Sequence, residues 1–337
     1  MEYEIITDPA KIDRKEWSDF VNNHPDGNIF QTPEIYTVYE KTEKYEPIIL
    51  IVKDKNRIVG ILLSVIQKEN SGFLGIFSAR SIVWGGPLIK NNDVEVLDLV
   101  LKEYDVNIRK KSIYTQFRNF WDWKNLDIIF KNSGFKYEEH LNILINLEKK
   151  EEQLWRDVHS KRRNEIRRAK KEGAVFSVET TIESLTECFN IIKEVYSFAK
   201  LPYPSFNFFK KLFENSQKRI GLKIFTAKYK NEIIGCMLAL VFKDTIYDFY
   251  AGSYRKYYKK YPNDLIPWEV FLWGKENGYK NFDFGGAGKP GVPYGVRDYK
   301  KKFGGEFVNF GRFEKVHKPI IYRFAKTGFK LWRIIKK

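Results

Sequence analysis

Short apolar runs alternate with polar turns and longer helical segments along the whole chain. Five runs rich in Ile, Leu, Val and Phe are expected to be strands, at 48–52, 61–66, 141–146, 224–227 and 236–242. The segment 151–172 is expected to be a helix because a thin apolar stripe runs along it, and further helices are expected at 93–111 and 263–277. Strands interspersed with helices predict a mixed α/β class.

A repeated segment indicates an internal duplication. The sequences Lys53-Asp-Lys-Asn-Arg-Ile-Val-Gly60 and Lys228-Tyr-Lys-Asn-Glu-Ile-Ile-Gly235 share the pattern Lys-x-Lys-Asn-x-Ile-(Val/Ile)-Gly and lie 175 residues apart. Each copy lies between two apolar runs, so each predicts a β-hairpin with a polar turn. Lys-Asn turns are common between strands, but an offset of about half the chain is what a duplicated domain requires.

The order of elements around the two hairpins is similar. In each half, helices precede the hairpin, and another strand, a helix and a last strand follow it; the last strands are expected at 141–146 and 281–284. A chain of 337 residues also exceeds the size at which one hydrophobic core keeps growing. We therefore expect two domains, 1–147 and 148–317, joined near a charged run at 147–152.

Charge and composition narrow the class of partner. Lys and Arg outnumber Asp and Glu by 59 to 43, and the formal charge of +16 favours an anionic partner. A tRNA, a lipid-linked or nucleotide-linked precursor and an anionic membrane surface all fit, while codon bias toward lysine is the alternative explanation. Two isolated cysteines and four isolated histidines show no metal-ligand spacing, so no metal is expected. The acidic N-terminus and the lack of a long apolar run predict a cytoplasmic location.

Several motifs, in their order and spacing, resemble those of a known family. They are Gly27-Asn-Ile-Phe-Gln-Thr-Pro33, Gly85-Gly-Pro-Leu88, the cationic segment 159–173, Tyr247-Asp-Phe-Tyr-Ala-Gly-Ser253, Phe282-Asp-Phe-Gly-Gly286 and Tyr299-Lys-Lys-Lys-Phe-Gly-Gly305. With them, the chain resembles the Fem (FemABX-like) family of peptidoglycan interpeptide-bridge aminoacyltransferases and related GNAT-like proteins of polysaccharide gene clusters. The resemblance extends over nearly the whole chain.

The resemblance implies two tandem GNAT-like (acyl-CoA N-acyltransferase) domains that arose by duplication, with the second domain supplying most of the chemistry. It also implies that a last helix, 318–337, packs on the first domain. The coiled-coil arm of some members has no counterpart here. Members that bind a nucleotide-linked muramyl peptide often have Trp and Lys where this chain has Ile35 and Tyr39, and often an acidic residue where it has Gln116-Phe-Arg-Asn-Phe-Trp121. The Arg-Asn pattern resembles the polysaccharide-cluster relatives.

Forming an amide from an ester or thioester requires a neutral amine, a group that stabilises the oxyanion, and exclusion of water. The family motif matches at Lys300, which the resemblance implies contacts a substrate phosphate or the developing negative charge. The alternative is that Lys300 belongs to a solvated lysine run. Asp283 and Asp248 lie at predicted strand ends, where a carboxylate can accept the amine proton, although a turn or cap role is the alternative for each.

Six further residues are candidates for substrate binding. Tyr250 and Tyr254 flank a break after a predicted strand, although aromatic residues at strand spacing more often fill a core. Lys200 and Tyr203 occupy a turn where the family grips the substrate phosphate. The remaining two candidates are arginines, Arg297 and Arg118.

The donor is expected to be an aminoacyl-tRNA or an acyl-CoA, with no bound cofactor. The (Arg/Gln)-x-x-Gly-x-(Gly/Ala) pyrophosphate loop of coenzyme-A acetyltransferases is not found after Tyr250, which favours a donor other than acetyl-CoA. The first hypothesis is aminoacyl or acyl transfer to an amine of a cell-wall precursor. The alternatives are a CoA-dependent N-acyltransferase of an amino sugar in surface polysaccharide synthesis, and a non-catalytic membrane-surface binding protein.

Two basic segments bear on localisation and partners. The segment 319–337 interleaves apolar and basic residues at helical spacing, so it can lie on the inner face of an anionic membrane or dock on the first domain as an ordinary helix. The segment 161–171 can bind tRNA or present a solvated helix face. Stable DNA binding is not expected.

Overall fold

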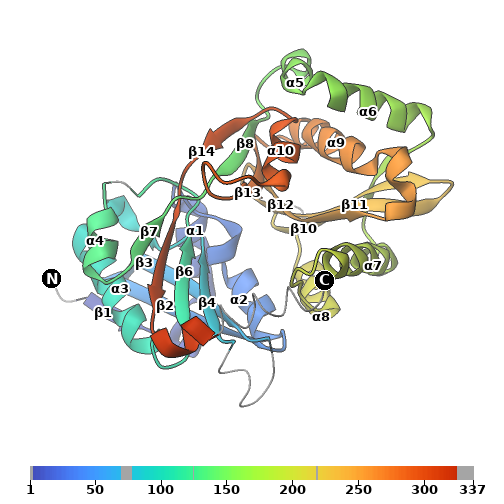
Figure 1. Cartoon of the computed structure of the whole chain (residues 1–337). Coiled ribbons are helices and arrows are strands. Elements are labelled where there is room, and N and C mark those ends of the chain that lie inside the picture. The colour runs from blue at the N-terminus through green and yellow to red at the C-terminus, as the bar shows by residue number, and fades with distance from the viewer. Residues whose placement is uncertain (1–2, 70–77, 124, 218, 325–337) are drawn as a thin grey trace. The chain divides into compact units, whose positions relative to one another are not determined.

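The computed structural model describes residues 3–69, 78–123, 125–217 and 219–324. The chain forms two compact units, Met1–Glu139 with Phe310–Lys337, and His140–Asn309. Each unit is a mixed sheet with helices on both faces (Figure 1). In the part of the chain that is described, no helix has the length and apolar character needed to cross a membrane.

The first unit is built on an eight-stranded sheet. Its elements are β1 (Tyr3–Ile6), η1 (Pro9–Lys11), α1 (Arg14–Asn23), η2 (Ile29–Gln31), α2 (Pro33–Glu40), β2 (Tyr45–Asp54), β3 (Arg57–Gln67), β4 (Arg80–Trp84), β5 (Leu88–Ile89), η4 (Lys90–Asn92), α3 (Val94–Ile108), β6 (Tyr114–Arg118), α4 (Asp127–Asn132), β7 (Lys136–Glu138) and β15 (Arg312–Val316). The strand order is β1-β2-β3-β4-β6-β15-β7, and β5 pairs with β3. Helix α3 packs on β2 and β3 with α4 beside it, while α1 and α2 cover the opposite face.

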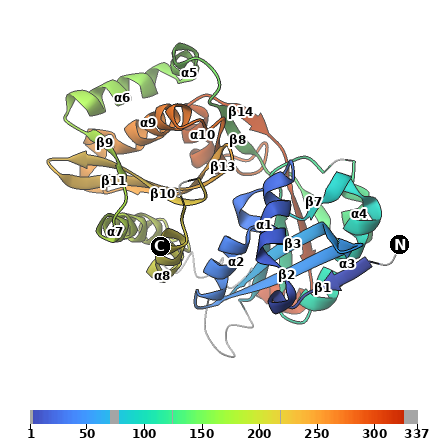
Figure 2. The same ribbon diagram turned by 180° about the vertical axis from the view of Figure 1, so that it is seen from behind.

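The second unit is built on a seven-stranded sheet of the same design. Its elements are β8 (Asn142–Asn146), α5 (Glu151–Asp157), α6 (Ser160–Lys171), β9 (Val175–Glu179), α7 (Ile182–Phe198), α8 (Phe206–Glu214), β10 (Gly221–Tyr229), β11 (Glu232–Phe242), β12 (Thr245–Ser253), η5 (Arg255–Lys260), α9 (Pro262–Glu276), β13 (Asn281–Gly286), α10 (Gly295–Lys301) and β14 (Glu306–Val308). The strand order is β14-β8-β13-β12-β11-β10-β9. Helices α7 and α8 lie on one face of the sheet, and α6 and α9 lie on the other (Figure 2).

One strand from each half completes the sheet of the other unit. β8 follows β7 in the chain but pairs with β13 and β14, and β15 follows β14 but pairs with β6 and β7. The strand expected at 141–146 therefore exists, but it belongs to the second sheet. The boundaries of the units fall at 139/140 and 309/310 rather than at the expected 147/148, because a strand belongs to the sheet that satisfies its backbone hydrogen bonds.

Both copies of the repeated segment form the expected hairpin. β2 pairs antiparallel with β3, and β10 with β11. The two turn residues have positive φ in each copy, 46° and 62° at Lys55 and Asn56, and 50° and 67° at Lys230 and Asn231. This is the type I′ geometry that matches the twist of a hairpin. The mixed α/β class and the duplicated architecture are thus confirmed in the backbone itself.

Gly60 and Gly235 end the two copies where a helix crosses the strand closely. A Cβ atom would lie 2.9 Å from Val96 Cγ1 at Gly60, and 2.8 Å from Pro262 Cβ at Gly235. We expect Gly235→Ala to lower the free energy of unfolding by about 1–3 kcal/mol, because overpacking forces neighbouring atoms to shift. Urea denaturation beside Gly295→Ala checks this, since a Cβ on Gly295 meets no described atom within 4 Å. Equal stability of the two variants would contradict it.

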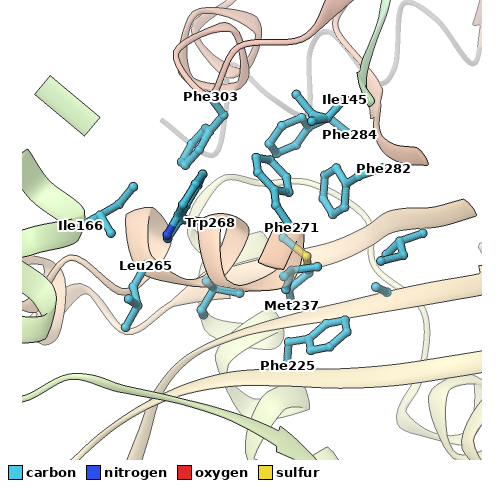
Figure 3. Packing of buried hydrophobic residues seen from close by; sticks show 14 of the residues in the cluster. Ile145, Ile166, Phe225, Met237, Leu265, Trp268, Phe271, Phe282, Phe284 and Phe303 are labelled. Carbon is cyan, nitrogen blue, oxygen red and sulfur yellow. The ribbon is translucent and has the colours of Figure 1, made fainter. Parts of the chain in front are cut away.

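Aromatic side chains fill the core of the second unit (Figure 3). Phe271 of α9 contacts Phe282 and Phe284 of β13, with ring centroids 5.0 and 5.8 Å apart. The ring of Phe303, which follows α10, lies 5.7 Å from that of Phe284. All four side chains are buried. This packing fixes the end of β13 and the start of the segment that follows α10.

The helix expected at 151–172 is in fact two helices, α5 and α6. Val158 and His159 between them have extended backbones, with ψ of 128° and 139°. The His159 side chain accepts a hydrogen bond from the Lys161 backbone N–H, as a helix N-cap does. The chain turns here while Val158 stays buried in the core.

The C-terminal segment begins a helix at residue 319. The ring of Tyr322 lies 5.4 Å from that of Tyr114, and its hydroxyl donates to Glu314, so residues 319–324 pack on the first unit. The rest of the helix expected at 318–337, residues 325–337, lies outside the described residues.

Candidate active site

The parallel strands β12 and β13 separate in the middle of the second sheet. Their pairing joins only residues 245–247 to 281–283, although β12 continues to Ser253 and β13 to Gly286. Just past the paired part, Phe249 forms a bulge against β11, and bulges commonly redirect side chains beside active sites. In the first sheet, the corresponding strands β4 and β6 stay paired over all five residues of each. The opening is therefore a feature of the second unit.

Lys300 lies near the end of α10 and reaches β13 at this opening. Its Nζ donates hydrogen bonds to the carbonyl oxygens of Phe284 and, at 3.4 Å, Gly286. Among the described residues, these contacts use two of the three ammonium N–H groups, which leaves one for a substrate. Lys300 is half-buried whereas Lys301 is exposed, so Lys300 is not part of a solvated run.

Two carboxylates accompany Lys300. Asp283 is 6% exposed, and its Oδ1 accepts a hydrogen bond from the Gly285 N–H at 2.6 Å, while Asn142 Nδ2 lies 3.4 Å from Oδ2. Burial raises the pKa of Asp283 to about 6, although the Gly285 hydrogen bond and the Lys300 charge favour its ionised form. Burial also raises the pKa of Asp248, against the effect of the Lys300 charge. Asp248 is half-buried and is the first residue of β12 past the paired part.

The raised pKa of Asp283 has a consequence for stability. Because the folded protein holds this proton more tightly than the unfolded chain, the stability contributed by Asp283 falls as the pH rises from about 4 through about 6. The Asp283→Asn variant can keep the hydrogen bond from Gly285. We expect the difference in free energy of unfolding between this variant and the parent protein to change in favour of the variant by on the order of 1–2 kcal/mol from pH 5 to pH 8. Urea denaturation of both proteins at the two pH values measures this gain. A constant difference would show that Asp283 is not strained by burial.

The candidate tyrosines gather along β12 and α7. Tyr250 contacts the rings of Tyr196 and Phe209, with centroids 5.3 and 5.2 Å apart. The Tyr203 hydroxyl accepts a hydrogen bond from the Ser197 hydroxyl at 3.3 Å, and its ring lies 6.5 Å from that of Tyr196. Tyr254 is half-buried at the end of β12. The tyrosines therefore line the continuation of the strand that carries Asp248.

The two basic candidates of the second unit have distinct settings. Lys200 lies two residues after α7 in the left-handed conformation, with φ of 53°, and it is half-buried. Arg297 instead donates to the backbone carbonyls of Val292 and, at 2.7 Å, Lys289. The guanidinium of Arg297 thus holds together the loop between β13 and α10, and one of its partners, the Ala287 carbonyl, is next to the Gly286 carbonyl that Lys300 contacts.

Arg118 lies in the first unit, where two of the family-like motifs meet. The Asn28 side chain donates to the Gly85 carbonyl at 2.5 Å, and the Gln31 side chain donates to the Trp84 carbonyl at 2.8 Å. The Arg118 guanidinium stacks on Trp84, 4.2 Å from the ring centre. The motifs at 27–33 and 85–88 therefore build one local structure.

A buried ion pair connects α6, α9 and α10. Arg162 pairs with Asp264 in the first turn of α9, and with Glu165 at 2.9 Å. Its guanidinium also lies 4.9 Å from the ring centre of Tyr299, the neighbour of Lys300 in α10. From the sequence alone, Arg162 belongs to the cationic segment 159–173, which can present a solvated helix face. Its position four residues before the buried Ile166 is the signal that could have indicated its burial.

Asn142 is another residue at the site that the sequence did not indicate. It comes from β8, far from the motifs of the second half, and only the exchange of strands brings it to Asp283.

Among the described residues, no group of three His, Cys, Asp or Glu side chains could hold a metal ion.

The second unit matches a known domain family. Residues 156–301 fit the family model of the acetyltransferase (GNAT) domain, a range that includes β12, β13 and α10. This match identifies the second unit as a GNAT-type acyltransferase domain. A comparison with curated proteins finds no match.

Solved structures share the fold of the whole chain. FemX is 14% identical, with 96% of this chain and 99% of FemX covered and a TM-score of 0.73. L-PGS from Bacillus licheniformis is 16% identical, with 93% and 96% covered and a TM-score of 0.58. A tandem GNAT protein from the clavulanic acid biosynthesis pathway is 10% identical, with 94% and 99% covered and a TM-score of 0.58. These likenesses confirm the tandem GNAT-like fold and, at the level of the fold, the resemblance to Fem proteins.

Proposed function

We propose that the chain transfers an aminoacyl or acyl group to an amine of a cell-envelope precursor and so forms an amide bond. The observation that carries this proposal is the opening between β12 and β13, with Lys300 and Asp248 at it, inside a GNAT-type domain. The envelope acceptor is supported by the resemblance to the Fem family, whose members act on peptidoglycan precursors.

The geometry supports a direct transfer without a covalent enzyme intermediate. Asp248 takes a proton from the ammonium form of the acceptor, and the neutral amine attacks the carbonyl carbon of the donor. The free N–H of Lys300 stabilises the oxyanion that forms. The bond from carbon to the donor oxygen or sulfur then breaks, and the leaving group takes up the proton that the attacking nitrogen gives up. Tyr250 and Tyr254 are assigned to the path of the substrate along β12.

We further propose aminoacyl-tRNA as the donor. In coenzyme-A acetyltransferases, backbone N–H groups at a helix N-terminus bind the pyrophosphate. Here α9 begins with Pro262, which has no N–H, and its cap residue Tyr261 is left-handed with φ of 53°. The Asp264 carboxylate in the first turn is buried and already paired with the Arg162 guanidinium, so this end of the helix has its charges satisfied within the protein. These features support a donor that is held elsewhere.

The alternative donor is an acyl-CoA, with an amino sugar as acceptor, and the match to the GNAT domain is the observation that favours it. The test is mass-spectrometric detection of a new amide on envelope amine acceptors, with the purified protein and either charged tRNA or a panel of acyl-CoA donors. Product that forms only with charged tRNA, and is lost on ribonuclease treatment, supports the first proposal. Product with acyl-CoA alone supports the alternative. If no product forms with either donor, the result supports the remaining alternative, a non-catalytic binding protein.

A further inference from the structure

The segment after β12 has an unusual composition. Residues 254–261 read Tyr-Arg-Lys-Tyr-Tyr-Lys-Lys-Tyr, which is four tyrosines and four cations without a carboxylate. Six of these residues form the 3₁₀ helix η5, in which side chains three apart share a face. Two of the three rows that result, Arg255 with Tyr258 and Tyr257 with Lys260, therefore combine an aromatic ring with a cation, and the third row, Lys256 with Lys259, is cationic only.

One face of η5 points into the protein. Tyr257 and Tyr261 pack against the hydrophobic core of the second unit. Lys260 forms an ion pair with Glu172 at the end of α6, at 3.0 Å. The Tyr257 hydroxyl donates to Glu232. The inner face therefore accounts for the fixed position of η5.

The other face is exposed and offers three cations and a tyrosine. Arg255, Lys256, Tyr258 and Lys259 are exposed, and Tyr258 is 50% exposed. Arg168 of α6 is also exposed, and its guanidinium lies over Tyr261, 4.9 Å from the ring centre. The positive charge of the exposed face itself comes from η5.

A stacked pair lies at the edge of this surface. The Arg255 guanidinium lies 3.8 Å from the ring centre of Phe198, the last residue of α7. Phe198 is 66% exposed, which is unusual for a side chain of this size. Unpaired nucleobases stack on aromatic rings and on guanidinium planes, and cations beside them neutralise the phosphates.

We propose that the platform, defined as Phe198 with Arg255, Lys256, Tyr258 and Lys259, binds the single-stranded 3′ end of the RNA that carries the donor amino acid. The proposal rests on the proposed function. β12 runs from Asp248 to Ser253, and Tyr254 follows directly, so about 20 Å of extended chain leads from the platform toward the opening. An anionic membrane is a weaker fit, because the cation stacked on Phe198 would have to be desolvated with the ring.

The test compares binding of two RNAs by the full-length protein. Intact uncharged tRNA is measured beside the same tRNA without its unpaired 3′ nucleotides. We expect the parent protein to bind intact tRNA about 10- to 100-fold more tightly than the trimmed form, and Phe198→Ala/Tyr258→Ala to lose this difference. Lys256→Ala/Lys259→Ala should weaken binding of both RNAs and reduce the salt dependence of the affinity.

The control is Phe324→Ala, which removes a ring that is 75% exposed in the first unit. It should bind both RNAs as the parent protein does. The proposal is overturned if the Phe198→Ala/Tyr258→Ala variant still distinguishes the two RNAs. It is equally overturned if that variant binds RNA normally but loses binding to phosphatidylglycerol vesicles. Amide formation from charged tRNA, measured separately on the parent protein, shows whether the proposed function survives either result.

Discussion

Lys300→Met is expected to lower kcat/KM for amide formation by about 10²–10³-fold, the usual loss when one oxyanion donor is removed. Methionine keeps an unbranched stem of similar length but removes the ammonium that contacts the Phe284 and Gly286 carbonyls. The loss should appear mainly in kcat, because the charge that Lys300 stabilises develops only in the transition state.

The matched control is Lys301→Met, one residue further along α10 and exposed. It should retain activity within a few-fold, since an exposed lysine makes no contact at the opening. Circular dichroism of both variants establishes that they are folded. Similar activities of the two variants would mean that the lysine run acts only through its general charge, and Lys300 would lose its assigned role.

Asp248→Asn is expected to lower kcat/KM by about 10²–10⁴-fold, because the amide side chain cannot take the proton of the attacking amine. The carboxylate must be ionised to act, so the activity of the parent protein falls as the pH drops through the pKa of Asp248. Burial places that pKa above the ordinary value of 3.8. A pH profile of kcat/KM from pH 4.5 to 8.5 measures this fall of activity toward low pH, the acid limb of the profile. The acid limb should be absent in the Asp248→Asn variant.

The second carboxylate provides the comparison for Asp248. The Oδ1 atom of Asp283 already accepts a hydrogen bond from Gly285, so Asp283 is assigned to support of the loop. Asp283→Asn should therefore keep activity within about 10-fold, and the acid limb should remain. A loss of the limb in Asp283→Asn but not in Asp248→Asn would exchange the roles of the two residues.

The hairpins were predictable because their information is local. The Lys-Asn turns and the alternating apolar runs determine the type I′ geometry without reference to the rest of the chain. The exchange of β8 and β15 was not predictable in the same way. Both are strands of only five residues, and no periodicity tells which of two similar sheets so short a strand will complete.

The candidate site was predictable in part. Motif matching pointed to Lys300, Asp283 and Asp248, and the structure brings all three to one opening. The supporting place of Arg297 could not be inferred, because it depends on how the loop of residues 287–292 folds back on the guanidinium. Long-range contacts of this kind depend on tertiary structure rather than on sequence spacing.

The most direct test of the central claim, that transfer takes place at the opening between β12 and β13, is a single-turnover measurement. Isotopically labelled amino acid on a charged tRNA is mixed with excess protein and an amine acceptor, and labelled amide is followed by mass spectrometry. The parent protein is expected to form the amide, and the folded Lys300→Met/Asp248→Asn variant is expected to form it at least about 10²-fold more slowly. Amide formation at the same rate by both proteins would contradict the account.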